Sequence, residues 1–550
     1  MADSVVQRSA DQRQAQPGEP TCMVCGRYGE FVCDATDEDV CSLECRDICV
    51  SRQQQRLQSD QQLNERADEL RCKLGIKLAI KSTSETAARS FPASQWPIPI
   101  VEFEQGGMEL PKELLSNLNA SGFERPTSVQ MQTIPCVLKG HNMLVSAPTG
   151  SGKTASYLIP AIAQSLLARG QEEEILTLVL APVRELAIQI ETVAKTLMKG
   201  IPNMKTALLV GGFPVPKQRY RLQSEVQLIV ATPGRFVDIF TNYSGGDAIL
   251  PGIRTCVVDE VDTMLDVGFR PQISQIVALL GGECHKHVQL VFLSATVSSE
   301  VETLVQQLLK ARNEQTYVRL DVRGDKSTTA ESFVLNPSVR HQVRWSEDKA
   351  KKNELFKFLK GKSEESTLVF VGSKVGATML AQAIEKRCEV GAAAIHADKT
   401  QQERLRLLES FVNLEIPVLV STNVLSRGMD LLNVENVVVY DFPKKVTDYV
   451  HLIGRVGRGV DVLGNALTLL NLEDRSLFRE LVPLLRQAKV LVPREVHQNI
   501  HSEDAKKRAN VNECKWAFRF REKLVKDRSL RTSDWKEWEH HNNKRRRTRP

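Results

Sequence analysis

One segment restricts the fold of this chain more than any other, the run Ala147-Pro148-Thr149-Gly150-Ser151-Gly152-Lys153-Thr154. An apolar stretch, residues 142–146, precedes it, and a stretch compatible with a helix, residues 155–168, follows it. In such a loop glycines let backbone N–H groups turn inward around phosphates, and the helix N-terminus adds partial positive charge. Lys153 can reach the outer phosphates, and the Thr154 hydroxyl can ligate Mg²⁺. The segment predicts a nucleoside-triphosphate site, with Ala147 in the place of the first glycine of the general pattern.

Carboxylates follow a second apolar run. Residues 255–258 lead into Asp259-Glu260-Val261-Asp262, at the carboxyl end of an expected buried strand, where nucleotides bind in open parallel sheets. Asp259 is expected in the Mg²⁺ shell, and Glu260 is expected to orient or deprotonate the attacking water. Taken alone, this tetrapeptide could be an acidic loop without a catalytic role. The catalytic interpretation is favoured because Ser294-Ala295-Thr296, after residues 288–293, offers two hydroxyls that could bond to Asp262.

Length and composition fit a globular protein of about three domains. The chain has 550 residues, of which 42% are hydrophobic and 25% are charged. Residues 1–20 are polar and no run of about 18 uncharged apolar residues occurs, so neither a secretory signal nor a membrane span is predicted. We expect a soluble, intracellular protein with no membrane partner.

Positive charge is concentrated at the C-terminus. The formal net charge is +6, and residues 501–550 carry 16 Lys and Arg against 8 Asp and Glu. The stretch from Lys544 to Arg549 could be a nuclear import signal, a nucleic-acid contact or a solvated end. The first two together are favoured, so the nucleus is the expected compartment, with the cytoplasm as a second one. Aromatic residues of the same region, such as Trp516 and Trp538, could stack on bases or pack a helix onto the preceding domain.

Six of the twelve cysteines fall between Cys22 and Cys49, which indicates metal binding in a chain expected to be intracellular. Cys22-x2-Cys25 and Cys41-x3-Cys45 form two pairs, and four sulfurs satisfy tetrahedral Zn²⁺. So short a segment with few apolar residues could hardly fold without that ion. Six free buried thiols are the alternative, disfavoured because the segment has no core to bury them.

The cysteine spacing resembles HIT-type zinc fingers, in which two interleaved four-ligand sites lie along a short segment. The resemblance assigns Cys22, Cys25, Cys41 and Cys45 to the first site. It assigns Cys33 to the first ligand of the second site, in which Cys49 stands where the family has histidine. Thr36 and Gln53 occupy the other two ligand positions and are not usual zinc donors. One zinc ion is expected, with Cys33 and Cys49 as a degenerate second site.

The next stretch is expected to connect the finger to the rest of the chain. Residues 51–83 are rich in Gln, Arg, Glu and Leu, and their leucines are spaced loosely for a helix. This predicts a helical linker, with a partner-binding helix as the alternative. Residues 84–99 bring Ser, Ala and three prolines, which predict an extended connection.

Apolar strand-like runs then alternate with helix-length segments in two successive regions. The first region contains residues 142–146, 176–180, 226–231, 255–258 and 288–293. After a polar stretch, the second contains residues 366–371, 392–396, 416–421, 434–440 and 465–470. Such alternation predicts an α/β protein with parallel sheets covered by helices. Because only the first copy has a phosphate loop, catalysis is expected at the cleft between the two.

These ordered motifs resemble the DEAD-box RNA helicases over residues 103–485, and the finger resembles the small subgroup that carries a HIT-type finger at the N-terminus. The resemblance implies two tandem RecA-like domains with parallel sheets, preceded by a small zinc-bound finger. The expected parts are a disordered N-terminus (1–20), the finger (21–50), a helical or extended linker (51–100), RecA-like domain 1 with the ATP site (101–325), RecA-like domain 2 (335–485) and a basic C-terminal extension (486–550).

Residues 122–130 resemble the family's Q motif, whose glutamine reads the adenine edge through paired hydrogen bonds. The resemblance therefore assigns Gln130 to adenine and implies ATP as the nucleotide. Phe103 stands where the family has an aromatic side chain that stacks on adenine, at a slightly longer spacing. A core phenylalanine is the equal alternative.

Three segments of the first copy resemble the family's RNA-contact motifs. The residues that the resemblance assigns to RNA are Arg184, Gly212, Thr232, Gly234 and Arg235. Arg side chains, Thr hydroxyls and backbone amides suit phosphates and 2′-hydroxyls, which position a strand without reading its sequence. Backbone-directed, largely sequence-independent RNA is therefore the implied partner. Val183 replaces a threonine of the first motif and removes one hydroxyl.

The second copy carries the remaining motifs. The resemblance assigns Gln401, Arg404 and Thr422 to RNA, and Gly428 and Asp430 to the ATP ribose. Asn423 stands where the family has Asp. Arg455 and Arg458 are expected to stabilise charge on the transferring phosphoryl group. His451 is assigned, with Asp262, Ser294 and Thr296, to the coupling of the ATP and RNA sites.

The implied activity is RNA-stimulated ATP hydrolysis, in which ATP and single-stranded RNA draw two domains together and open short duplexes. The alternative is an assembly factor that recruits partners through its finger and tail while the ATPase core switches conformation. HIT-type fingers in other proteins are associated with RuvB-like AAA+ ATPase complexes, which makes such ATPases the expected partners. A DNA translocase is disfavoured by the Q-motif resemblance.

Overall fold

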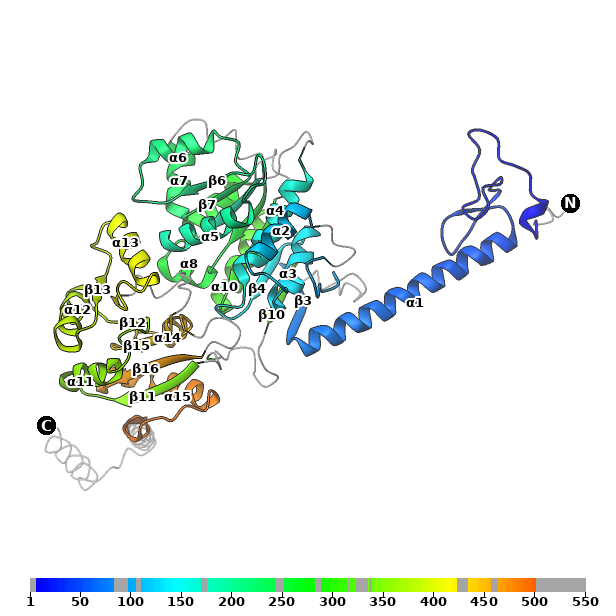
Figure 1. Ribbon diagram of the computed structural model, residues 1–550. Coiled ribbons are helices and arrows are strands. Elements are labelled where there is room, and N and C mark those ends of the chain that lie inside the picture. The colour runs from blue at the N-terminus through cyan, green and yellow to red at the C-terminus, as the bar shows by residue number, and fades with distance from the viewer. Residues whose placement is uncertain are drawn as a thin grey trace, which may run out of the picture. The chain divides into compact units, whose positions relative to one another are not determined.

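The computed structural model describes residues 6–83, 97–104, 110–169, 176–242, 252–281, 288–314, 316–322, 335, 339–422, 434–456 and 463–500 (Figure 1). The chain divides into two compact units, with the main boundary between residues 332 and 333. Each unit is built on one β-sheet, and the first also contains the cysteine-rich segment. The predicted α/β fold with two tandem sheets is confirmed.

The cysteine-rich segment is small and irregular. It contains a 3₁₀ turn η1 (Ser9–Asp11) and the antiparallel strands β1 (Phe31–Val32) and β2 (Asp39–Val40). Ser42 caps the N-terminus of helix α1 (Leu43–Lys73), and its side chain accepts a hydrogen bond from Cys45 N. Residues 6–20 were expected to be disordered, but the structure describes them against the finger. Ser9 N donates to Glu44 Oε2 at 2.8 Å, and an Arg27 guanidinium nitrogen donates to the Gln12 carbonyl at 2.6 Å.

The first unit contains an eight-stranded sheet in the order β3-β10-β4-β9-β8-β5-β7-β6. The strands are β3 (Ile76–Ser82), β4 (Met143–Ser146), β5 (Leu176–Leu180), β6 (Thr206–Leu209), β7 (Leu228–Ala231), β8 (Ile253–Val258), β9 (Gln289–Ser294) and β10 (Thr316–Val322). All neighbours pair in parallel apart from β3, which is antiparallel to β10. The carboxyl ends of the seven parallel strands therefore lie along one edge, where ligands bind in such sheets.

Strand β3 lies in the stretch that was expected to be a linker. Its sequence alternates apolar Ile76, Leu78 and Ile80 with Lys77 and Lys81, which is the period of a half-buried strand. It pairs with β10 along its whole length. Helix α1 is therefore joined, through a short turn, to an integral strand of the first unit (Figure 1). Strands β6 and β10 were also not predicted.

Helices cover both faces of this sheet. They are α2 (Lys112–Ala120), α3 (Ser128–Leu138), α4 (Lys153–Leu167), α5 (Arg184–Leu197), α6 (Val215–Leu222), α7 (Pro233–Asn242), α8 (Val261–Val267), α9 (Arg270–Leu279) and α10 (Ser299–Ala311). Successive side chains of β4 point to opposite faces of the sheet. Met143 and Val145 join the core under α3 to α5, whereas Leu144 joins the core under α7 to α10. The buried strands are near-continuous apolar runs, as both-sided burial requires.

The second unit has a six-stranded, all-parallel sheet in the order β11-β16-β15-β12-β14-β13. Its elements are β11 (Val339–Trp345), α11 (Asp348–Leu359), β12 (Thr367–Phe370), α12 (Lys374–Cys388), β13 (Ala392–Ile395), α13 (Gln401–Val412), β14 (Val418–Ser421), β15 (Asn436–Val439), α14 (Val446–Ile453), β16 (Gly464–Leu470), η5 (Leu472–Leu477) and α15 (Phe478–Gln487). All five predicted runs contain a strand, and β11 was not predicted. Among the described residues, no helix has the length and apolar character to cross a membrane.

Candidate nucleotide, nucleic-acid and zinc sites

The phosphate loop lies between β4 and α4, as the sequence predicts. Gly150 and Gly152 have φ angles of +77° and +90°, a region that glycine adopts without the steric cost of a Cβ atom. Lys153 is the first residue of α4, and its Nζ donates to the carbonyl oxygens of Ala147 and Pro148 at 2.7 and 2.8 Å. The ammonium group is thus held across the loop by oxygens that phosphate oxygens can replace.

Helix α3 closes one side of this loop. Thr127 Oγ1 donates to the Ser151 carbonyl at 2.7 Å, and Gln130 Nε2 donates to the Gly152 carbonyl at 3.1 Å. Gln130 is almost fully buried, and its Oε1 accepts from Thr127 N at 3.0 Å in a capping box. A Cβ atom on Gly152 would lie 2.5 Å from Gln130 Nε2, so only glycine allows this approach. The segment that resembles the Q motif is therefore hydrogen-bonded directly to the phosphate loop.

Asp259 directly follows β8 and is 3% exposed. The Tyr157 hydroxyl, from α4, donates to Asp259 Oδ2 at 2.9 Å. Burial first, and then the charge of Glu260, raise the pKa of Asp259 to about 6. Burial also raises the pKa of Tyr157, so the phenol remains a donor at neutral pH. A divalent cation at this carboxylate would offset the cost of its buried charge.

This raised pKa predicts how Asp259 affects stability. Because the folded protein holds the proton up to about pH 6, whereas the unfolded chain loses it near 3.8, the free energy of unfolding falls as pH rises through this interval. Asp259→Asn should therefore raise the free energy of unfolding by about 3 kcal/mol near pH 8, and by progressively less toward pH 4. Urea unfolding of the metal-free and nucleotide-free protein at several pH values measures this. A pH-independent difference between variant and wild type would contradict it.

Asp262 connects the loops after β8 and β9. Thr296 Oγ1 donates to Asp262 Oδ2 at 2.7 Å, and Thr296 N donates to the same oxygen at 3.2 Å. Ser294, the second hydroxyl considered for this carboxylate, donates to the Thr296 carbonyl at 2.5 Å. Glu260 has a left-handed backbone, with φ of +50°, and its Oε2 accepts from Thr263 Oγ1 at 3.3 Å. Asp262 is thus fixed by a hydroxyl from the loop after β9, and Glu260 accepts from a hydroxyl in the first turn of α8.

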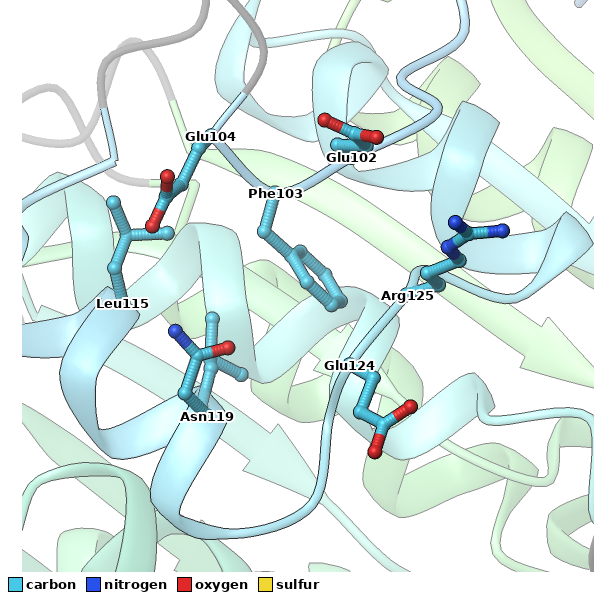
Figure 2. A pocket seen from close by; sticks show the side chains of 8 residues that line it. Glu102, Phe103, Glu104, Leu115, Asn119, Glu124 and Arg125 are labelled. Carbon is cyan, nitrogen blue, oxygen red and sulfur yellow. The ribbon is translucent and has the colours of Figure 1, made fainter.

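Phe103 lines a pocket of about 180 Å³. The other lining residues are Glu102, Glu104, Leu115, Leu118, Asn119, Glu124 and Arg125. Figure 2 shows the ring pointing into the space between Asn119 and Arg125. Phe103 is 5% exposed and also belongs to the apolar core of α2 and α3. The two alternatives for this residue, a core side chain and a wall of a ligand site, are therefore compatible in the structure.

Three predicted backbone-contact motifs follow the neighbouring strands β5, β7 and β6. Arg184 begins α5, and a Cβ atom on Gly211 would lie 2.8 Å from its Nη2, so the guanidinium packs directly on this glycine. An Arg235 guanidinium nitrogen donates to the Phe213 carbonyl at 3.1 Å. Thr232 N donates to the Leu209 carbonyl at 2.9 Å. Gly212 adjoins Gly211. Gly234 lies in the first turn of α7, and a Cβ atom added to it would have open space around it.

In the second unit, the described site residues also follow strand ends. Gln401 begins α13 after β13, Arg404 lies one turn later, and Thr422 follows β14, with its N–H donating to the Ile395 carbonyl at 3.3 Å. His451 and Arg455 are each 2% exposed, and Arg455 Nε donates to the His451 carbonyl at 3.2 Å. Gly428, Asp430 and Arg458 lie outside the described residues.

The four cysteines assigned to the first zinc site lie together. The sulfurs of Cys22, Cys25, Cys41 and Cys45 all lie within 4.8 Å of one another. Cys41 Sγ is 3.4 Å from Cys25 Sγ and 3.6 Å from Cys45 Sγ. A tetrahedral zinc ion with Zn–S bonds of about 2.3 Å holds its sulfurs about 3.8 Å apart, so the four side chains fit this ion.

The remaining two cysteines do not form such a group. Cys49 Sγ lies 3.3 Å from Glu38 Oε2, and Cys33 is buried nearby in the same small cluster. Within the part of the chain that the structure describes, no group of three or more metal-binding side chains includes Cys33 or Cys49. The structure therefore offers one four-sulfur site.

Known protein families match three parts of the chain: HIT zinc finger at residues 18–47, DEAD/DEAH box helicase at residues 127–304 and helicase conserved C-terminal domain at residues 350–460. The human protein "Probable ATP-dependent RNA helicase DDX59" is 39% identical over 518 residues, which cover 91% of this chain and 80% of the human protein. The chain belongs to the DEAD-box helicases. The rice "DEAD-box ATP-dependent RNA helicase 41" is 39% identical over 516 residues, covering 90% of this DEAD-box helicase and 91% of the rice protein.

Solved structures agree with this assignment. The structure "DEAD-box helicase Mss116 bound to ssRNA and UDP-BeF" has a TM-score of 0.61 and 25% identity, and the match covers 70% of this chain and 77% of that one. The structure "S. cerevisiae Dbp5 bound to RNA and ADP BeF3" has a TM-score of 0.56 and 26% identity, covering 70% and 93%. The two sheets of this DEAD-box helicase are RecA-like, and its cysteine cluster is a HIT-type finger.

Sequence reasoning missed side chains that support this helicase's site. Tyr157 lies one helical turn after Lys153, a spacing that brings it to the strand end carrying Asp259. Thr127 was also not assigned, although its Thr-x-x-Gln spacing to the predicted Gln130 is that of a capping box and was a readable signal. Arg71 and Gln132 form a buried cluster for which no sequence pattern is diagnostic.

Proposed function

We propose that this DEAD-box helicase catalyses RNA-stimulated ATP hydrolysis and couples it to local unwinding or clamping of RNA. One observation carries the proposal. The phosphate loop, the Ser-Ala-Thr and acidic motifs and the three backbone-contact motifs follow six consecutive strands of one sheet, β4-β9-β8-β5-β7-β6. A nucleotide at the first three strand ends and a nucleic-acid strand at the last three would share one edge.

Lys153 is the residue that we assign to the outer phosphates, where its ammonium group would exchange two loop carbonyls for phosphate oxygens. Thr154 and Asp259 are the residues that would hold Mg²⁺, whose contribution is to neutralise charge on the phosphates. Glu260 orients the attacking water and accepts its proton. Gln130 and Phe103 would bind adenine, which makes ATP the expected nucleotide.

The backbone-contact motifs would hold RNA through its phosphates and 2′-hydroxyls, so binding should depend little on sequence. Arg184 and Arg235 supply charge, and each is held in place by a neighbouring backbone segment, at Gly211 and at Phe213. The Asp262–Thr296 hydrogen bonds join the loop after β8 to the loop after β9. These contacts fix two of the strand ends assigned to the nucleotide relative to each other, and β8 is the direct neighbour of β5, the first strand of the proposed RNA edge.

Steady-state ATP turnover, with and without single-stranded RNA and single-stranded DNA, tests the proposal. We expect RNA to stimulate turnover at least about tenfold over the RNA-free rate and DNA to stimulate it much less. Equal turnover with and without RNA would overturn the proposed function. Equal stimulation by DNA and RNA would favour a DNA translocase instead.

Gly211 offers a test of the RNA edge. In Gly211→Ala the new Cβ would lie 2.8 Å from an Arg184 nitrogen, so the flexible guanidinium must move while the fold is retained. We expect the RNA concentration for half-maximal stimulation to rise about fivefold or more, because charge-assisted contacts to phosphate depend on position. The KM for ATP should change little. RNA titrations of ATP turnover measure both quantities.

Gly391→Ala is the matched control for that variant. The same Cβ would meet ordinary contacts of 3.5 Å or more, on the carboxyl side of α12 in the second unit. We expect wild-type RNA dependence for this control. A Gly211→Ala protein that also shows wild-type RNA dependence would remove Arg184 from the proposed RNA contacts.

We also propose a protein partner for the finger. Met23 and Val32 are 64% and 61% exposed, which leaves apolar surface on a domain too small to bury it. RuvB-like AAA+ ATPases are the class that the resemblance to HIT-type fingers suggests. Co-purification of a RuvB-like ATPase by wild type and not by a Met23→Asp/Val32→Asp variant would support the partner.

We further propose the nucleus as the compartment of this protein, with the cytoplasm as a second one. The basic run at residues 544–549, outside the described residues, supports nuclear import.

A further inference from the structure

Arg71 is a buried arginine that none of the motifs accounts for. It lies in the last turn of α1 and is 5% exposed. Its Nε donates to Gln132 Oε1 at 2.9 Å, and its Nη2 donates to the Pro97 carbonyl at 2.9 Å. Its Nη1 forms an ion pair with Asp68 at 2.5 Å, one turn earlier in α1. The guanidinium therefore has a partner in each of three directions.

The two segments that Arg71 joins are those that carry the adenine-side residues. Gln132 lies in α3, two residues after Gln130, and is fully buried. Pro97 begins the described segment that leads to Phe103. Gln132 Nε2 also donates to the Pro97 carbonyl at 2.8 Å, so one carbonyl oxygen accepts from both side chains. Arg71, Gln132 and Pro97 thus form a closed triangle of hydrogen bonds.

A second contact continues this attachment toward Phe103. Ile100 N donates to the Met131 carbonyl at 2.9 Å, which ties the 97–103 segment to α3 again one residue from Gln130. At the other end of α3, Thr127 and Gln130 bond to the phosphate loop. The spacing between Phe103, Gln130 and the loop therefore depends on how the 97–103 segment lies on α3.

The chemistry of this cluster requires an arginine. A buried charge costs free energy unless it is paired and hydrogen-bonded, and general stability would be served equally well by an apolar side chain. The planar guanidinium offers donors in fixed directions, so it can contact Gln132, Pro97 and Asp68 at once. A lysine at this position offers a single nitrogen and cannot span all three partners.

We propose that Arg71 is a positioning residue of the ATP site, which holds the 97–103 segment against α3 so that Phe103 and Gln130 keep the spacing for adenine. The inference rests on the proposed ATP-dependent function. It also gives α1 two roles, because the zinc ligand Cys45 lies in its first turn and Arg71 in its last. Deletions that extend past Arg71 would remove this contact together with the finger, so point variants are needed to separate them.

The test compares Arg71→Met with Arg71→Lys in the full-length chain. We expect Arg71→Met to raise the KM for ATP about tenfold and to leave kcat at saturating ATP and RNA within about twofold, which is the signature of lost binding without lost chemistry. Arg71→Lys should raise the KM by a smaller factor. The preference for ATP over GTP, measured as the ratio of their KM values, should fall in the same order, because Gln130 reads adenine.

Arg319→Met is the matched control. Arg319 is a largely buried arginine of the same unit, on β10, and pairs with Glu302 and Asp321. Its loss should lower the melting temperature without changing the ratio of the KM values. Gln132→Met removes the other end of the Arg71 contact and should reproduce the Arg71→Met effect, and the double variant should show a less than additive change.

The outcomes separate this inference from the proposed function. A wild-type protein without RNA-stimulated turnover would overturn the proposed function. If the wild type is active and folded Arg71→Met keeps the wild-type KM for ATP and the wild-type ATP-to-GTP ratio, the positioning role alone is overturned. If Arg71→Met does not fold, the ATP-to-GTP ratio of KM values is measured in Arg71→Lys and Gln132→Met instead. A wild-type ratio in both variants would overturn the proposal.

Discussion

Replacing Glu260 with glutamine is expected to lower RNA-stimulated ATP turnover by about 10²- to 10⁴-fold, the usual contribution of a general base. Glu260 caps α8 with φ of +50°, directly after the buried Asp259. Glutamine preserves the size of the side chain and can still accept from Thr263, but it cannot take a proton from water. The fold and nucleotide binding should therefore be kept. Single-turnover hydrolysis and nucleotide binding, measured separately, resolve the two effects.

Glu225→Gln is the control for this substitution. Glu225 has nearly the same backbone conformation, with φ of +51°, but is exposed and lies before β7, away from the strand ends of the site. Wild-type turnover is expected for it. If Glu260→Gln hydrolysed ATP within about threefold of the wild-type rate, Glu260 would not be the base. Loss of nucleotide binding in the same variant would instead indicate a structural defect.

Loss of zinc is expected to unfold the finger, because metal binding contributes on the order of 10 kcal/mol to the folding of such domains. Among the described residues, the cluster of buried side chains in this segment consists of five of the six cysteines and Val40, and Cys25 is exposed. Cys41 contacts two of the other three ligand sulfurs, so Cys41→Ser removes a central ligand. We expect zinc content to fall from one per chain to near zero, and residues 21–50 to become sensitive to proteolysis.

Cys49→Ser is the matched control, because Cys49 lies outside the four-sulfur group. It should retain one zinc ion and a protected finger. RNA-stimulated ATP turnover should survive in both variants, since the sheet of the first unit has its own core. Two zinc ions per wild-type chain would contradict the single site. Protection of residues 21–50 in metal-free Cys41→Ser would contradict the role of the ion in folding.

The parallel strands and their loops were largely readable from the sequence. A strand buried on both faces must be a short apolar run, and β4, β5, β7, β8 and β9 have this character. Strands β3 and β11 were missed because they combine alternating polar residues with an edge position, where half of the side chains remain accessible. Their apolar residues recur at about every second position, and in a short segment this pattern is a weaker signal of a strand than a continuous apolar run.

The four-sulfur site was likewise predictable, since two close pairs of cysteines leave few ways to arrange their ligands. The state of residues 6–20 was not. Their composition is polar, and their order comes from individual hydrogen bonds, such as that of Ser9 to Glu44, between positions far apart in the chain. Composition reports on apolar burial and carries no information about such pairs.

The phosphate loop, the acidic motif and the cysteine ligands could be recognised from the sequence alone, because local requirements of backbone geometry and charge fix their residue types and spacing. Three features became visible only in the folded protein: α1 leads directly into a strand of the first unit, β3 completes the sheet of that unit, and Arg71 joins Gln132 to Pro97. Such contacts depend on which elements pack together. A buried guanidinium acquires its role only when partners from distant segments meet it with the right geometry.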